Sequence, residues 1–269
     1  MVFKDYDIKI VAFSDIHGNV DAFKETVNFI RTLKGVDYIL IAGDIADWPG
    51  PEEAERAFRD LVKMFRLLEE LNIKYFFVLG NWDIFFVEDL LNARNLNLHR
   101  ISIEEELKEA DSIFREILRQ ADSKNGVLLD KSAVHMLNKD IKLTSNPALV
   151  DSKTIFLIHA YKTVRSDALL HIEGHWGLYA QLNKSKNYLN LGFIYGGGYR
   201  GYKGLKGCLW EIIIKDVKVA EIKWHNLGGA LREFYCPIHK EEGLFIIPSH
   251  WKECPICHNP QRARFTRSR

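Results

Sequence analysis

The chain has 269 residues, of which 47% are apolar and 27% are charged. This composition is typical of a folded globular protein, and the length suffices for one large domain or two modest ones. Its 37 lysine and arginine residues against 36 aspartate and glutamate residues leave a net charge of +1, which excludes a uniformly basic nucleic-acid coat protein. No apolar run reaches the ~18 residues that cross a membrane, and residues 1–9 lack the apolar core of a secretory signal. We therefore expect a cytoplasmic protein with no membrane partner.

Apolar runs alternate with amphipathic segments over the first 160 residues. The runs at residues 8–13, 38–42 and 75–79 have the length and the composition of buried strands. The segments that follow the first two runs have helical periodicity, and the second begins at Pro51, a residue type favoured in the first turn of a helix. Strands that alternate with helices predict an α/β fold with a largely parallel, covered sheet.

A further amphipathic segment, residues 101–122, predicts a helix inserted into this pattern. Ser102 and Glu105 fit a capping box at its start, and apolar residues recur behind them with helical spacing. Shorter apolar runs then predict strands at 126–129, 141–144 and 154–158 and a hairpin from 209–214 and 217–224. The pair Gly228 and Gly229 predicts a boundary between a main domain, 1–227, and a small module, 228–269.

Polar residues stand where the predicted strands end. Six of them come directly after apolar, strand-like runs: Asp15, His17, Asp44, Asn81, His159 and His175. Because the carboxyl ends of parallel strands lie along one edge of a sheet, we expect these side chains to converge. Carboxylate and amide oxygens mixed with imidazole nitrogens are typical ligands of divalent transition metals. The sequence therefore predicts a metal site at this edge.

These residues belong to five motifs in order: Asp15-Ile-His17, Gly43-Asp44-Ile-Ala-Asp47, Gly80-Asn81-Trp82-Asp83, the lone His159 and Gly174-His175. Over residues 8–225 the order and context of the motifs resemble the calcineurin-like metallophosphoesterases, and Asn190-Leu-Gly192 resembles a further motif of that family. The resemblance implies a layered β-sandwich core of the metallophosphoesterase type, flanked by helices.

The resemblance also implies one or two divalent transition metals, Mn, Fe or Zn. One metal would bind Asp15, His17 and Asp44, and the other would bind Asp44, Asn81, His159 and His175, with Asp44 bridging. Two cations ~3.5–4 Å apart lower the pKa of a bridging water and clamp the phosphoryl oxygens. The catalytic residues implied are Asp44, Asn81, Trp82 and Asp83, with Asp47 and Asp83 expected to act by orienting their neighbours.

The chain departs from the family pattern at two positions. Trp82 stands where the family has a histidine that contacts phosphate or protonates the leaving group, and an indole N–H cannot serve as a general acid. Gly177 stands where the family has the second histidine of its last motif, which removes one ligand from the Asp15 and His17 metal. His171 has the wrong spacing to replace it and is expected to be an ordinary core or surface histidine. Catalysis could therefore be slow, restricted to good leaving groups, or absent.

Two similar knuckles, Cys236-Pro-Ile-His239 and Cys254-Pro-Ile-Cys257, lie near the end of the chain and are separated by 14 residues. They resemble a zinc ribbon, in which three cysteines and one histidine hold a structural zinc ion. His250 and His258 stay open as substitute ligands. Cys208 stands alone in an apolar stretch.

Residues 174–210 contain no acidic residue and five basic ones. By analogy with the family this segment would lie near the substrate, where aromatic faces can stack on bases and cations can bind phosphates. The candidate contacts are Tyr199, Arg200, Tyr202, Lys203 and Lys206. A plain surface loop is the alternative, and the basic tail at residues 262–269 has the same two interpretations.

Three hypotheses follow for the function. The first is a metal-dependent phosphoesterase that hydrolyses a phosphodiester or a nucleotide-type substrate by metal-activated water. The second is a catalytically impaired protein of the same fold that serves as a binding subunit, with the ribbon and the basic loop contacting nucleic acid or a protein partner. The third is a phosphoprotein phosphatase, which the fold allows and no residue singles out.

Overall fold

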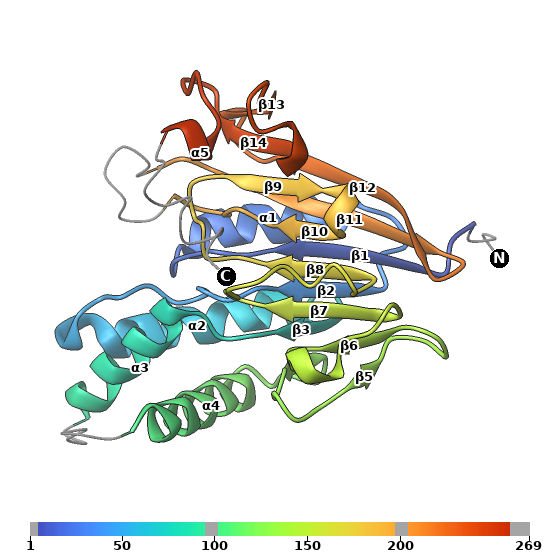
Figure 1. Cartoon of the computed structure of the whole chain (residues 1–269). Coiled ribbons are helices and arrows are strands. Elements are labelled where there is room, and N and C mark those ends of the chain that lie inside the picture. Colours follow the sequence, from blue (N-terminus) through green and yellow to red (C-terminus); the bar gives the residue numbers. More distant parts are fainter. Residues whose placement is uncertain (1–4, 95–101, 197–203, 259–269) are drawn as a thin grey trace.

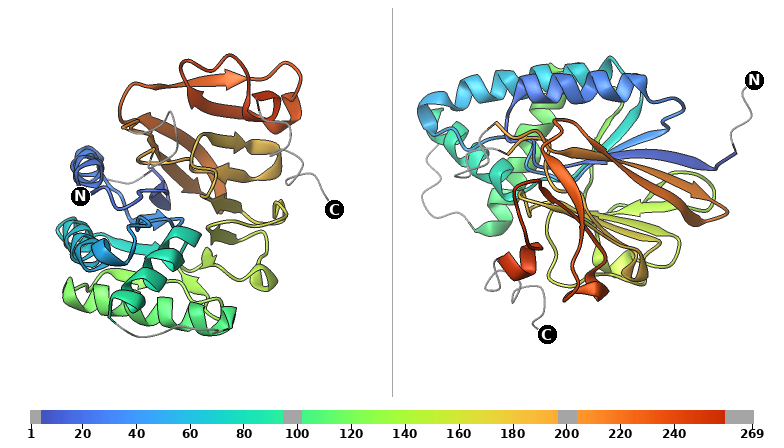
Figure 2. Two further views of the ribbon diagram at one scale, coloured as in Figure 1. Left: turned by 90° about the vertical axis from the view of Figure 1, so that its left-hand side faces the viewer. Right: turned by 90° about the horizontal axis from the view of Figure 1, so that it is seen from above.

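In the computed structural model, which describes residues 5–94, 102–196 and 204–258, two β-sheets lie face to face and helices cover the outer face of one of them (Figure 1). Figure 2 shows the layers from two further sides, with the helices on one side of the first sheet and the second sheet on the other. The α/β class and the layered sandwich core expected from the sequence are confirmed.

The first sheet contains the expected parallel strands. These are β1 (Ile8–Phe13), β2 (Tyr38–Ile41), β3 (Lys74–Phe77) and β4 (Gly126–Leu128), which pair in that order. The expected hairpin consists of β11 (Cys208–Lys215) and β12 (Lys218–Asn226), and β11 extends the sheet by pairing antiparallel with β1. The hairpin turns at Asp216 and Val217, whose φ angles of 52° and 55° give the left-handed turn that matches the twist of paired strands.

Four helices form the outer layer of the described part of the chain: α1 (Val20–Thr32), α2 (Pro51–Glu69), α3 (Asn81–Ala93) and α4 (Ile103–Gln120). The capping box of Ser102 and Glu105 is present at the start of α4. Phe114 and Ile117 of α4 are fully buried in the same core as the apolar faces of α1 and α2. The helix expected at residues 101–122 is therefore an integral part of the helical layer.

The second sheet is mixed and has eight strands in the described residues. Its strands from the main part of the chain are β5 (His135–Met136), β6 (Lys142–Thr144), β7 (Thr154–Ile158), β8 (Leu170–Glu173), β9 (Ala180–Asn183) and β10 (Tyr188–Asn190). They stand in the order β9-β10-β8-β7-β6-β5. A single apolar core between the sheets contains Ile10 and Trp210 of the first sheet together with Leu157 and Leu189 of the second.

The last described segment joins the second sheet. It contains β13 (Leu231–Tyr235), β14 (Leu244–Pro248) and the short helix α5 (Pro255–His258), and β14 pairs antiparallel with β9. Figure 1 shows this segment stacked beyond β9. The division of the chain at residues 227 and 228 stays a prediction. Among the described helices, none combines the length and the apolar character needed to cross a membrane.

Candidate metal centre

The loops that follow β1 and β2 have an unusual backbone. Asp15, His17 and Asp44 have φ angles of 55°, 49° and 52°, and His175, after β8, has 73°. This left-handed conformation costs a non-glycine residue on the order of 1 kcal/mol, and it persists where surrounding structure enforces it, often at functional sites. Here the N–H of Ile16 donates to the carbonyl of Asp44 at 2.8 Å, so the two loops hold each other.

Four candidate ligands converge on one point. The Oδ1 of Asn81 lies 3.1 Å from the Nε2 of His159 and 3.0 Å from the Nδ1 of His175. The same Nε2 lies 3.1 Å from the Nδ1 of His175 and 3.3 Å from the Oδ2 of Asp44. Two ligands at right angles, each ~2.1 Å from a metal, are about 3.0 Å apart, so this spacing fits a cation between the four side chains.

A second group contains Asp15, His17 and Asp44. One ligand atom from each lies within 4.8 Å of the others, and all three residues are buried. Asp44 belongs to both groups, which is the position that a bridging ligand needs. Among the described His, Cys, Asp and Glu residues no fourth one joins this group, and Gly177 has no side chain that could supply the ligand implied by the family pattern.

The hydrogen bonds around the centre fix how its ligands point. The Nδ1 of His159 lies 2.7 Å from the carbonyl oxygen of Ala42, which can only accept, so Nδ1 carries the proton and Nε2 faces the other ligands. The Oδ1 of Asp44 accepts a hydrogen bond from the backbone N–H of Trp82 at 2.9 Å. The Oδ2 of Asp15 accepts the N–H of His175 at 3.0 Å and the hydroxyl of Ser14. In each of these two carboxylates, hydrogen bonds from the protein therefore hold one oxygen in a fixed position.

The electric field of the centre favours a cation. Burial alone would lower the pKa of His159, but its hydrogen bond to Asp44 and the charges of Asp44 and Asp15 raise it to about 9. Burial and the charge of Asp44 raise the pKa of Asp15 to about 7. A divalent cation would neutralise these buried carboxylates and lie against acceptor atoms of Asn81, His159 and Asp44, so the donor set fits a metal.

Asp83 and Asp47 lie outside both ligand groups. The side chain of Asp83 is fully buried and accepts the N–H of Ala46 at 2.7 Å and the N–H of Gly80 at 2.8 Å. It thereby ties the loop of Asp44 to the start of α3. Asp47 accepts the N–H of Trp48 at 2.9 Å. Both residues are placed to orient neighbours, as expected, and the catalytic role implied for Asp83 stays a prediction.

Two glycines of the motifs, Gly80 and Gly174, have a steric role beside the candidate ligands that the sequence analysis did not assign. A Cβ on Gly80 would lie 2.1 Å from the Oδ1 of Asp44, and a Cβ on Gly174 would lie 2.0 Å from the Oγ of Ser14. No side chain fits at either position unless the ligand or its support moves. The available signal was a glycine directly before Asn81 and before His175.

Trp82, the first departure from the family pattern, lies against the second ligand group. Its ring meets that of His17 edge to face with 4.9 Å between centroids, and Trp48 meets Trp82 at 6.3 Å. Trp48 is 57% exposed and also contacts Phe85. An aromatic wall therefore stands where the family has an imidazole.

The other sequence candidates lie elsewhere or outside the described residues. Lys206 pairs with Glu25 at 2.5 Å, at the surface of α1. His171 is fully buried on β8 at 3.5 Å from Glu173 and belongs to neither ligand group. Four candidate contacts fall outside the described residues, as does the basic tail at 262–269: Tyr199, Arg200, Tyr202 and Lys203.

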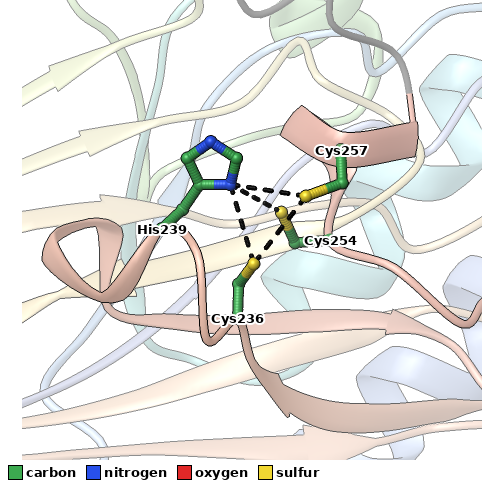
Figure 3. A group of neighbouring side chains, drawn as sticks. All are labelled: Cys236, His239, Cys254 and Cys257. Atoms are coloured by element: carbon green, nitrogen blue, oxygen red, sulfur yellow. Dashed lines mark hydrogen bonds between the residues drawn. The ribbon is translucent and has the colours of Figure 1, made fainter.

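The two knuckles come together at a separate site, which we call the cysteine module (Figure 3). The Nδ1 of His239 lies 3.6 Å from the Sγ of Cys236 and 3.5 Å from those of Cys254 and Cys257. The sulfurs of Cys236 and Cys257 are 3.9 Å apart. Tetrahedral zinc with bonds of ~2.3 Å to sulfur and ~2.0 Å to nitrogen separates its ligands by about 3.5–3.8 Å, so this donor set fits zinc.

The remaining cysteine and the substitute histidines stay out of the module. His258 stacks on Trp251 with 4.3 Å between ring centroids, and neither it nor His250 joins the group of four. Cys208 is buried between the sheets, where desolvation raises the pKa of its thiol to about 12. The three cysteines of the module are thus distinct in setting from Cys208.

Fold and centre together define a layered α/β protein whose side chains could hold divalent cations at the ends of parallel strands. The calcineurin-like phosphoesterase family matches residues 8–187, two thirds of the sequence, and the chain belongs to this family.

Several solved structures are similar to the chain at low identity. The protein TT1561 of Thermus thermophilus is 14% identical with a TM-score of 0.49, over 82% of this chain and 99% of that one. A conserved uncharacterized protein from Streptococcus pneumoniae, described as a predicted phosphoesterase, is 15% identical with a TM-score of 0.34, over 81% and 97%. A serine/threonine phosphatase from Saccharomyces cerevisiae is 16% identical with a TM-score of 0.36, over 82% and 81%. No curated protein matches the sequence.

Proposed function

We propose that the protein is a metal-dependent phosphoesterase that hydrolyses a phosphodiester or nucleotide-type substrate by attack of water. The observation that carries the proposal is the convergence of Asp44, Asn81, His159 and His175, with their ligand atoms 3.0–3.3 Å apart. Membership of the calcineurin-like phosphoesterase family supports it.

Divalent cations, Mn, Fe or Zn, would supply Lewis acidity that lowers the pKa of a water and neutralises charge on the phosphoryl oxygens. The protein supplies fixed positions. Asp44 is placed to be shared by both ligand groups. The carbonyl of Ala42 keeps His159 in one tautomer. The backbone N–H of Trp82 holds one oxygen of Asp44, so that the other oxygen faces the centre. Such ligands need little rearrangement when the substrate binds.

At the position where the family has a histidine, this site has no side chain that can donate a proton to the leaving group. Trp82 can donate a hydrogen bond through its indole N–H but cannot release that proton at neutral pH. We propose that the enzyme therefore prefers leaving groups that depart as stable anions, such as aryl oxides or phosphates.

The alternative is a binding protein in which the metal centre holds a phosphate without hydrolysing it. Trp82 and Gly177 favour this alternative because each removes a catalytic feature of the family. Its ligand would be a nucleic acid, or a protein that contacts the cysteine module.

We also propose that the cysteine module is a zinc ribbon with a structural role. Its own apolar core is small and consists mainly of Phe245, Ile247 and Trp251 beside the cysteines. A bound ion would therefore supply much of the free energy that folds the segment.

One experiment separates the two functions. Metal content is measured by elemental analysis, and hydrolysis of bis(p-nitrophenyl) phosphate is followed with added Mn²⁺. A phosphoesterase binds metal beyond the single zinc of the module and loses turnover in Asp44→Asn and His159→Ala. Metal binding without any turnover that depends on Asp44 would leave only the binding protein.

A further inference from the structure

A cleft of about 950 Å³ adjoins the metal centre, and Asn81 and His159 are among the residues that line it. Ligand pockets for small molecules typically enclose ~300–1,000 Å³. The cleft is therefore large enough for an organic group of the size of a nucleoside, and it is adjacent to the place where a phosphate at the centre would lie.

The floor of the cleft is mainly apolar, and its outer wall carries one apolar side chain among charged ones. The floor comes from the ends of β3, β4 and β7 through Val78, Leu128 and Ile158, and α3 contributes Ile84. The outer wall is the first half of α4, where Leu107 is 40% exposed. Covering an exposed apolar side chain with an apolar group removes it from water, so a ligand that covered Leu107 would gain free energy. The helix that the sequence marked as an insertion thus builds one side of this cleft.

The charges along the α4 wall are already compensated. Lys108 pairs with Glu104 at 3.3 Å, and Asp111 pairs with Arg115 at 2.6 Å. Of the charged residues that line the cleft, three are acidic and two are basic: Glu104, Asp111, Asp130, Lys108 and Lys131. The lining residues therefore carry no excess positive charge that would attract a polyanionic strand. An uncharged group would be neither attracted nor repelled by their net charge.

One residue that lines this cleft has a buried hydroxyl for which the described residues supply no partner. Ser145, in the loop after β6, is 4% exposed and lines the cleft, and among the described residues its Oγ has no hydrogen-bond partner. A buried hydroxyl without a hydrogen bond is unfavourable, so a ligand group that bonded to Ser145 would gain free energy.

We propose that this cleft binds the organic group of the phosphoester, and that the substrate is a small molecule whose group is bulky, uncharged, largely apolar and able to hydrogen-bond with Ser145. Leu107 and Ser145 are then specificity-determining residues. The inference rests on the proposed function for the position of the phosphate. It assigns the cleft to a small phosphoester and leaves a nucleic-acid strand as an outcome of the test.

The test compares two esters that share a leaving group, thymidine 5′-(p-nitrophenyl phosphate) and methyl p-nitrophenyl phosphate, with Mn²⁺. Leu107→Trp fills the cleft from its exposed wall and should lower the ratio of their kcat/KM values about tenfold. Ser145→Ala should lower it about fivefold. Glu109→Trp is the matched control, because Glu109 is exposed on the same helix and does not line the cleft. An unchanged ratio in both cleft variants would overturn the proposal.

A binding measurement separates this inference from the proposed hydrolysis. Thymidine 5′-monophosphate is titrated calorimetrically into the Mn²⁺-loaded protein and the three variants. If neither ester is hydrolysed but binding weakens in Leu107→Trp and Ser145→Ala alone, the enzyme proposal fails and the cleft stands. Three outcomes would each refute the cleft assignment. They are no binding of thymidine 5′-monophosphate, binding that these variants do not change, and much tighter binding of an oligothymidylate.

Discussion

The Nδ1 of His159 lies 2.7 Å from the carbonyl oxygen of Ala42, only two residues before Asp44. The end of β2 therefore provides one ligand and also orients another that comes from a distant strand. His159 follows β7 in the second sheet, so the two sheets meet at the metal centre through this hydrogen bond.

The shared position of Asp44 makes its carboxylate the most sensitive point of the centre. Mn²⁺ at 100 times its Kd should stabilise the wild-type protein by about 2.7 kcal/mol, because it binds the folded state alone. Asp44→Asn should abolish this increment in thermal unfolding followed with and without Mn²⁺. Asp47→Asn is the control, because Asp47 lies outside both ligand groups and should keep the increment. An undiminished response in Asp44→Asn would contradict the assignment.

Gly80→Ala should remove metal binding although it replaces no candidate ligand. The new Cβ would lie 2.1 Å from the Oδ1 of Asp44, so the carboxylate must move. Gly229→Ala is the comparison, because its Cβ meets no atom within 4 Å while its φ of 71° adds strain of about 1 kcal/mol. Elemental analysis for Mn should show loss in the first variant and full occupancy in the second. Equal occupancy in both would show that the ligands tolerate the contact.

Local patterns allowed the strand ends and their ligands to be predicted. Asp15, Asp44 and Asn81 each follow a short apolar run, and parallel strands bring such ends together whatever the rest of the fold does. The fit of Ser102 and Glu105 to a capping box located α4 for the same reason, since the signal lies within one turn.

Features that depend on distant partners could not be predicted. Helix α3 buries Phe86 and Leu90 between α2 and α4, which blurs the single apolar stripe that marks an amphipathic helix. The pairing of β14 with β9 joins segments about 60 residues apart, and no local signal encodes it. The contact between Gly80 and Asp44 likewise exists only once the two loops meet.

Trp82→His should restore an acid to the site. General acid catalysis contributes ~10²–10⁴-fold when the leaving group needs a proton. We therefore expect faster hydrolysis of alkyl phosphodiesters and little change for p-nitrophenyl esters. Trp82→Phe, which removes the indole N–H without adding an acid, should not accelerate either substrate. A gain of equal size for both substrates would indicate that the indole merely blocks access.

Cys254→Ser should release the ion of the cysteine module and unfold that segment. Zinc content should fall by one ion per chain, and limited proteolysis should cut within residues 231–258. Cys208→Ala is the matched control, since this thiol is buried in the main core away from the module. In a thiol titration of the native protein, a chelator should expose three reactive thiols, while Cys208 stays inert. Unchanged zinc content in Cys254→Ser would refute the assignment.

The pairing of β14 with β9 also decides what the protein presents to other chains. With the hairpin of β13 and β14 in place, β9 is an interior strand and its backbone groups are occupied. If the hairpin detached, β9 would become an open edge carrying the buried Leu182, a template on which a second chain could add a strand. If the module holds a structural ion as proposed, loss of that ion should therefore promote self-association of the protein.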